Sequence, residues 1–193
     1  MRKIAILSSG KSRGSNFLAI YDYIKIKSLP ISIEYLIVTD KSAPIVKIAL
    51  DRGIAIKYFE ESKKKINDFL LDIITQNPVD LIVLAGFMRK LSSAFFQNIK
   101  IVVINVHPAL LPKYGGKGMY GMNVHKAVFE AEEKVSGATI HIVDELYDNG
   151  FILCQKECDI SMCKSPDDIA KIVLRIEHEI YPKTIEKILF SEI

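Results

Sequence analysis

The sequence predicts an α/β protein with a Rossmann-like, doubly wound, mostly parallel sheet, helices on both faces and an antiparallel C-terminal strand pair. Short β-branched runs alternate with amphipathic helical stretches, which is typical of βαβ units. The apolar runs show little polar alternation, as expected when helices cover both faces of a sheet. Two further strand-like runs near the C-terminus are joined by an acidic loop, and we expect them to pair antiparallel.

The expected elements follow from these patterns. Five strands are predicted at Lys3–Ser8, Ile33–Thr39, Ala55–Tyr58, Leu81–Leu84 and Ile101–Asn105. The intervening helical stretches lie near 15–27, 44–52, 63–76 and 92–98. The late strand pair is predicted at Val135–Val143 and Phe151–Ile160. A last helix begins at Ser165, because an N-cap serine is followed by Pro166 and, three residues on, by Asp168.

Length and composition exclude several classes of protein. A chain of 193 residues, 49% hydrophobic and 25% charged, fits one ordinary globular domain. Its net charge of +3 comes from scattered lysines, so no nucleic-acid partner is expected. The longest apolar run, Leu81–Met88, is too short to cross a bilayer, and the N-terminus has no signal-peptide pattern. We therefore expect a cytoplasmic protein with no membrane partner.

The three cysteines are an odd number at irregular spacing. Cys154, Cys158 and Cys163 form no CxxC pair, so neither a zinc site nor a disulfide framework is indicated. The four histidines show no i, i+4 pairing either. We expect inert thiols and no metal.

A glycine-rich turn links the first strand to the first helix. In Ser8–Asn16 the glycines permit a tight turn, and the N–H groups that open the helix would form an anion site. Neither a Walker loop nor the G-x-G-x-x-G pattern is present, so a plain capped turn stays an alternative. Lys11 and Arg13 favour phosphate binding.

A second group of polar residues follows a buried strand. Asn105 and His107 share one face by period-two alternation, and Pro108 stops the strand there. Asp148, in the acidic loop between the two late strands, is a candidate third member. Non-catalytic roles stay open for two of them: His107 could be a structural histidine at a strand end, and Asp148 could be an ordinary turn residue.

Together, the three residues suit acyl transfer to an amine. The Asn105 amide and the His107 imidazole would stabilise an oxyanion. The carboxylate of Asp148 would take the ammonium proton and fix the protonation state of the histidine. The substrate amine is the nucleophile, so the enzyme needs no nucleophile of its own.

Three stretches of the sequence are distinctive. They are Leu84–Arg89, Asn105–Pro112 and His141–Gln155. These stretches resemble the phosphoribosylglycinamide formyltransferase family, whose enzymes catalyse the folate-dependent third step of purine synthesis. The last stretch has the family spacing of His141, Val143, Asp148, Gly150 and Gln155. The resemblance extends from Ser9 to about Pro182. It implies the formyltransferase fold in a single domain over 1–193, with a phosphate-binding half at 1–104 and a catalytic, folate-binding half at 105–193.

The resemblance also implies roles for particular residues. Asn105, His107 and Asp148 match the catalytic trio. The substrate ligands would be Gly14, Ser15 and Asn16 for the phosphate of glycinamide ribonucleotide, and Glu177 for its ribose. The pocket for the co-substrate 10-formyltetrahydrofolate would be lined by Met88, Arg89, Leu91, Val143 and Asp144. A monomer or weak homodimer is expected.

The chain departs from the commonest family form at three places. The phosphate loop has about two extra residues at 11–13, the 115–121 loop is longer, and Leu174 stands where a polar ribose contact is sometimes found. The glycines of the 115–121 loop favour a lid over a merely tolerated insertion.

Three alternative functions stay open at this point. A formyltetrahydrofolate hydrolase resembles the trio but usually carries an extra N-terminal domain, and the methionyl-tRNA formyltransferase usually adds a C-terminal one. We expect neither domain here. The third alternative, a non-catalytic folate or nucleotide binder, is disfavoured because all three trio positions are occupied.

Overall fold

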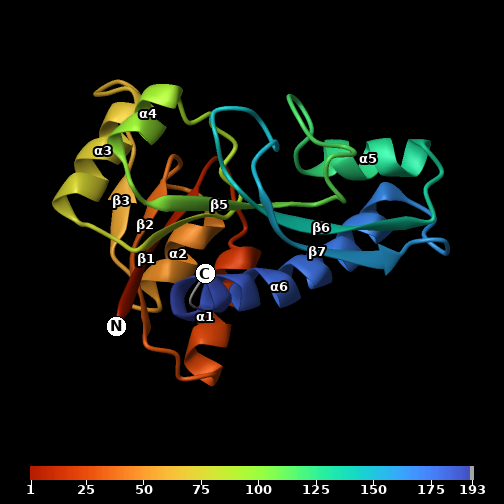
Figure 1. The fold of residues 1–193 in the computed structure, drawn as a ribbon, viewed down its shortest axis with the longest axis horizontal. Helices are drawn as coiled ribbons and strands as arrows, with labels where there is room; N and C mark the ends of the chain where they lie inside the picture. Colours follow the sequence, from red (N-terminus) through yellow and green to blue (C-terminus); the bar gives the residue numbers. More distant parts are fainter. Residues whose placement is uncertain (192–193) are drawn as a thin grey trace. The chain divides into compact units, whose positions relative to one another are not determined.

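The computed structural model describes residues 1–191, and its strands form one sheet. Within that part of the chain, seven strands follow the order β3-β2-β1-β4-β5-β6-β7 (Figure 1). In chain order the elements are β1 (Arg2–Ser8), α1 (Ser15–Ile26), β2 (Ile31–Val38), α2 (Pro44–Leu50), β3 (Ile56–Tyr58), α3 (Ile66–Gln76), β4 (Leu81–Leu84), α4 (Ser93–Asn98), β5 (Val102–His107), α5 (Met122–Glu130), β6 (Val135–Ile142), β7 (Ile152–Asp159) and α6 (Pro166–Phe190).

The chain divides into two compact units, Met1–Ile104 and Asn105–Ile193, with β5 contributing residues to both. In the first unit β1 pairs in parallel with β2 and β4, and β2 pairs in parallel with β3. Residues 4–7 of β1 are completely buried. Each large aliphatic side chain buried in this way contributes roughly 1.5–3 kcal/mol to the free energy of unfolding. Because β1 is held in the core, the position of its carboxyl end is fixed, and so is the start of the glycine-rich turn that follows it.

The second unit is built on an antiparallel pair. β6 and β7 pair antiparallel from Val135–Asp159 to His141–Ile152. The long helix α6 packs against β6, β7 and α5, and it runs along the two strands in Figure 1. Its stripe of Ile169, Val173 and Ile180 is buried, which explains the 3.6-residue spacing of these side chains in the sequence.

The structure confirms the predicted fold class and corrects individual elements. Helix α5 was not predicted, because Gly121 directly before it continued the pattern of a long glycine-rich loop. Helix α3 begins at Ile66, three residues later than expected. Three consecutive lysines at 63–65 would have put positive charge into the first turn of a longer helix, where the macrodipole disfavours it. Strand β5 extends two residues beyond the expected end, to His107.

The expected cap of the last helix is present. Ser165 Oγ accepts a hydrogen bond from Asp168 N (3.2 Å), and its hydroxyl donates to Asp168 Oδ2 (2.8 Å). We predict that Ser165→Ala lowers the free energy of unfolding by about 1 kcal/mol, or roughly 2–4 °C in Tm, because an N–H of the first turn loses its acceptor. Calorimetry checks this value. Ser161→Ala, at an exposed serine before the helix, is the matched control, and an equal effect there would contradict the role of the cap.

Candidate active site

A cluster of buried and half-buried polar side chains lies in the second unit. β5 supplies Asn105 and His107, β6 supplies His141, and the loop after β6 supplies Asp148. The two imidazoles are each 2% exposed. The Asp148 carboxylate lies against both of them, with Oδ2 at 3.5 Å from His107 Nδ1 and Oδ1 at 3.6 Å from His141 Nε2. The structure thus places the three residues predicted to be catalytic in one cluster, together with His141.

The protonation of His107 is constrained by its backbone partner. Its Nε2 lies 2.8 Å from the carbonyl oxygen of Tyr114, which can only accept, so Nε2 carries a proton. Nδ1 then faces Asp148. When Nδ1 is also protonated, the ring is an imidazolium paired with that carboxylate. When it is not, Nδ1 is the acceptor for a proton arriving through Asp148.

The second histidine has the opposite arrangement. His141 Nδ1 donates to the carbonyl oxygen of Ile142 (2.9 Å), which leaves Nε2 to accept from the Asn105 side-chain amide (3.3 Å). Burial lowers the pKa of His141, and this outweighs the opposing effects of the Ile142 carbonyl and the Asp148 carboxylate. His141 is therefore neutral at neutral pH and orients the amide of Asn105. His141 was part of the family spacing but not a predicted site residue, since only side-chain geometry shows this contact.

Asp148 is ionised despite its burial. Burial alone would raise its pKa, but the hydrogen bond and charge of His107, together with the Gly116 amide, lower it below the ordinary value. Gly116 N donates to Oδ2 at 3.0 Å. The backbone of Asp148 is left-handed, with φ 53°, a conformation that aspartate tolerates better than most residues. The carboxylate is therefore ready to accept a proton at neutral pH.

A hydroxyl and an amide hold the segment that follows His107. Thr139 Oγ1 donates to the carbonyl oxygen of Ala109 (2.6 Å) and accepts from Leu111 N (3.1 Å). Gln155 Nε2 donates to both Leu111 O and Thr139 Oγ1. Gln155, which belongs to the family spacing, thus holds the backbone at Leu111 beside the cluster.

The predicted phosphate loop lies in the first unit. Gly14 has φ 79° and caps α1 without a side chain, and its carbonyl accepts from Leu18 N. A Cβ at this position would come within 2.9 Å of Ile45, so only glycine fits. The first turn of α1 holds no acidic residue. The N–H groups of Ser15 and Asn16 therefore open a helix whose N-terminal dipole favours an anion.

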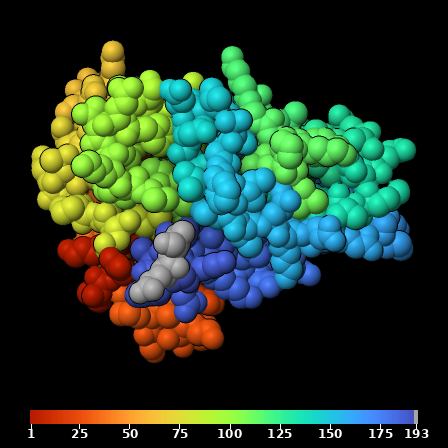
Figure 2. Space-filling model, viewed as in Figure 1, coloured from red at the N-terminus to blue at the C-terminus, as the bar shows by residue number. Residues whose placement is uncertain are grey.

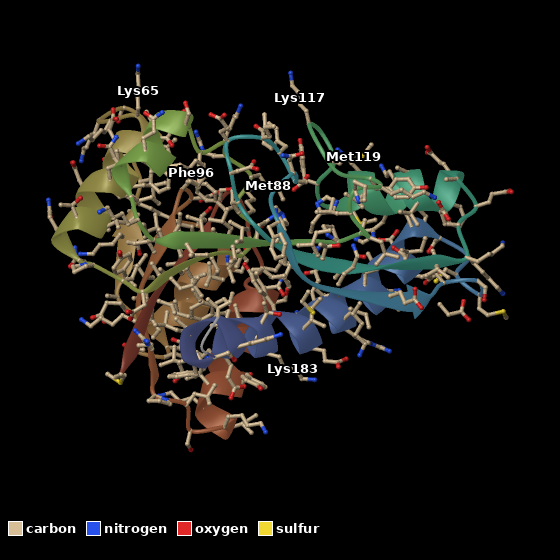
Figure 3. All side chains as sticks on the ribbon, viewed as in Figure 1. Lys65, Met88, Phe96, Lys117, Met119 and Lys183 are labelled. Carbon is tan, nitrogen blue, oxygen red and sulfur yellow. The ribbon has the colours of Figure 1, made fainter. Side chains whose placement is uncertain are left out.

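A pocket of about 770 Å³ opens beside this loop, at the carboxyl ends of β1, β2 and β4. Met88 and Arg89 line it, as do Lys11 and Ser12 of the lengthened loop. Met88 is exposed and is labelled in Figure 3. Arg89 pairs with Glu61, at 3.0 Å from Nη1 to Oε1. Leu91 is buried and does not line this pocket.

The remaining predicted ligands lie in the second unit. Val143 and Asp144 are half-buried at the start of the acidic loop, where Asp144 Oδ1 accepts from Leu146 N (2.7 Å). Glu177 is buried on α6. Within residues 1–191 no group of His, Cys, Asp or Glu is arranged to hold a metal ion, and no helix is long and apolar enough to cross a membrane. Burial raises the pKa of the Cys158 and Cys163 thiols, which makes both poor nucleophiles.

Comparison with known sequences identifies the class of protein to which this fold and this cluster belong. Residues 2–185 match the family described as formyl transferase, and the chain belongs to this family.

Several relatives carry the name phosphoribosylglycinamide formyltransferase. The Bacillus subtilis protein is 32% identical, over 98% of this chain and 95% of its own length. The chloroplast protein of Arabidopsis thaliana is 35% identical over 95% of this chain, which spans only 64% of that relative. The Campylobacter jejuni protein of that name has a solved structure with a TM-score of 0.84 and 30% identity, covering 97% of each chain.

Proposed function

We propose that this chain transfers the formyl group of 10-formyltetrahydrofolate to the amine of glycinamide ribonucleotide, in purine synthesis. The observation that carries the proposal is the half-buried carboxylate of Asp148, which lies against His107 and His141. His141 in turn contacts the Asn105 amide. An amide donor, an imidazole and an ionised carboxylate within one cluster suit attack of an amine on a carbonyl carbon. The relatives named phosphoribosylglycinamide formyltransferase support this choice of reaction.

In the proposed mechanism the amine nitrogen attacks the formyl carbon directly. The developing oxyanion accepts a hydrogen bond from the Asn105 amide, which has a second N–H besides the one directed at His141. The imidazolium that His107 forms when Nδ1 is protonated stabilises the oxyanion by its charge. Asp148 receives the proton that the ammonium nitrogen releases, directly or through water. The bond between the formyl carbon and the folate nitrogen then breaks, and that nitrogen takes up, directly or through water, the proton that Asp148 received. No covalent intermediate with the protein forms.

The ligand contacts are also proposals. The phosphate of the ribonucleotide binds at Gly14, Ser15 and Asn16, and Glu177 binds its ribose. The folate lies along Met88, Arg89 and Leu91 and along Val143 and Asp144. We also propose a cytoplasmic monomer or weak homodimer with no nucleic-acid partner, and a lid role for the 115–121 loop. The tip of that loop stands out from the surface in Figure 2, with the Lys117 side chain pointing outward in Figure 3.

The phosphate contact predicts a selective loss. Ser15→Ala combined with Asn16→Ala should raise the KM for the ribonucleotide about tenfold or more. The double variant keeps the backbone N–H groups but loses the side-chain hydrogen bonds to the phosphate, and hydrogen bonds to a charged ligand contribute about 1.5–3 kcal/mol each. The KM for the folate should not change. Steady-state kinetics with each substrate varied in turn measures both values. An equal rise for both substrates would contradict a phosphate-specific role for the loop.

The function itself is tested by following folate absorbance with and without glycinamide ribonucleotide. Turnover that requires the ribonucleotide supports the proposal. Steady release of formate without it would make the chain a hydrolase. No change in folate absorbance in either assay would favour a non-catalytic binder.

A further inference from the structure

The imidazole of His107 is held by a backbone carbonyl that has its own support. Tyr114 presents its carbonyl oxygen to His107 Nε2 at 2.8 Å while its backbone is left-handed, with φ 56°. For a residue with a Cβ this conformation costs roughly 1–2 kcal/mol, so other contacts must maintain it. Two residues further on, the Gly116 amide donates to Asp148. The segment 114–116 therefore contacts both members of the His107–Asp148 pair.

The tyrosine side chain supplies one such contact. The Tyr114 hydroxyl donates to Glu133 Oε1 at 2.9 Å, and Lys113 Nζ donates to the same oxygen at 2.8 Å. Partial burial, followed by the neighbouring carboxylate, raises the pKa of Tyr114, so the phenol stays protonated and can donate. The hydrogen bonds of Lys113 and Tyr114 lower the pKa of Glu133, which therefore stays an anionic acceptor. The side chain of Tyr114 is thus tied to a residue 19 positions later in the chain.

The position of Glu133 is set by the way α5 ends. Glu132 is left-handed, with φ 52°, and its N–H bonds to Phe129 O (3.0 Å). Glu133 N bonds to Val128 O (3.4 Å). These two bonds form a Schellman motif, the usual stop of an α-helix. The Schellman motif therefore fixes the backbone of Glu133, and with it the position from which the carboxylate reaches the Tyr114 hydroxyl.

We propose that Tyr114 is a positioning residue for the catalytic imidazole, held in its left-handed conformation by the hydrogen bond from its hydroxyl to Glu133. The inference rests on the proposed function for its kinetic consequences only. The contacts that carry it run from the C-terminal end of α5 through Glu133 and the Tyr114 side chain to the Tyr114 carbonyl. That carbonyl keeps the His107 proton on Nε2 and so directs Nδ1 at Asp148. The C-terminal end of α5 thereby acts on the His107 ring through Glu133 and Tyr114.

The kinetic test compares variants that keep or remove the hydroxyl–carboxylate bond. Tyr114→Phe and Glu133→Ala should each lower kcat about tenfold, because a small displacement of a reacting group is costly, while both KM values stay unchanged. The double variant should be no slower than either single one. Glu133→Gln keeps an acceptor oxygen and should retain most of the activity. Lys113→Ala, which removes only an exposed ion pair, is the matched control and should behave like the unaltered chain.

A second readout does not depend on turnover. The nitrogen-15 resonances of His107, assigned with a His107→Gln variant, should move in Tyr114→Phe and Glu133→Ala but not in Glu133→Gln or Lys113→Ala. Additive kinetic losses, equal losses in Glu133→Gln and Glu133→Ala, or an unmoved His107 resonance would overturn the proposal. If the unaltered chain transfers no formyl group, the proposed function fails, and the resonances still decide the positioning role. If Tyr114→Phe does not fold, the two Glu133 variants carry the test.

Discussion

Asp148→Asn is expected to lower kcat for formyl transfer by about 10³-fold while both substrates still bind. The amide has the shape of the carboxylate and can still accept from Gly116 N through its oxygen. It cannot take up the proton that the attacking amine releases, and it leaves the His107 imidazole without the carboxylate beside Nδ1. Single-turnover kinetics, with substrate binding measured separately by calorimetry, gives the two quantities.

A carboxylate outside the cluster provides the control for this result. Asp159→Asn, at the end of β7, removes the charge of a carboxylate outside the cluster and keeps an oxygen that can accept from Ser161 N. It should leave kcat unchanged. Near-normal single-turnover transfer by Asp148→Asn would show that Asp148 does not handle the proton, and loss of substrate binding would show that its role is to hold the ligands.

Gly150→Ala is expected to have the largest effect on stability. A Cβ at this position would lie 1.8 Å from the carbonyl oxygen of Ile142, which is backbone and cannot move aside as a side chain can. Ile142 N bonds to Phe151 O at 2.9 Å, so the clash would force apart the base of the loop that carries Asp148. We predict a loss of about 3 kcal/mol or more in the free energy of unfolding, together with loss of activity. Denaturant unfolding monitored by circular dichroism measures it.

The control for Gly150→Ala is a glycine with space around it. Gly53 has φ 70°, and a Cβ there would meet nothing within 4 Å. Gly53→Ala should therefore cost only the conformational strain, about 1 kcal/mol. Similar losses at both glycines would mean that the close approach of Gly150 to Ile142 is relieved by small shifts of the backbone.

The strands were the most predictable part of this fold. Buried β-branched runs such as Leu81–Leu84 have the same bounds in the sequence analysis and in the structure, because burial on both faces leaves a continuous apolar pattern. Helix α5 was missed for the opposite reason. It is only nine residues long, apolar and polar residues are mixed in it, and of its buried residues Val124, His125 and Val128 the two valines give only one repeat of the helical spacing. A pattern of that length does not distinguish a helix from a loop.

The candidate site was predictable in its members and not in its contacts. Asn105 and His107 could be placed on one face because strand alternation is a local property. The contact of Asp148 with His107 depends on a loop conformation stabilised by Gly116 and by the tight approach at Gly150. The contact of the Tyr114 carbonyl with His107 could not be predicted from residue types, because it is made by a backbone atom. The assignments of the phosphate and folate ligands stay predictions, since no contact within the described residues tests them.

The most direct test of the central claim is to identify the product of a single turnover with a carbon-13 formyl label on the folate. The account predicts that the label appears on the amine of glycinamide ribonucleotide, one equivalent for each tetrahydrofolate formed, and that none appears when the ribonucleotide is left out. Labelled formate, formed at the same rate with and without the ribonucleotide, would contradict it.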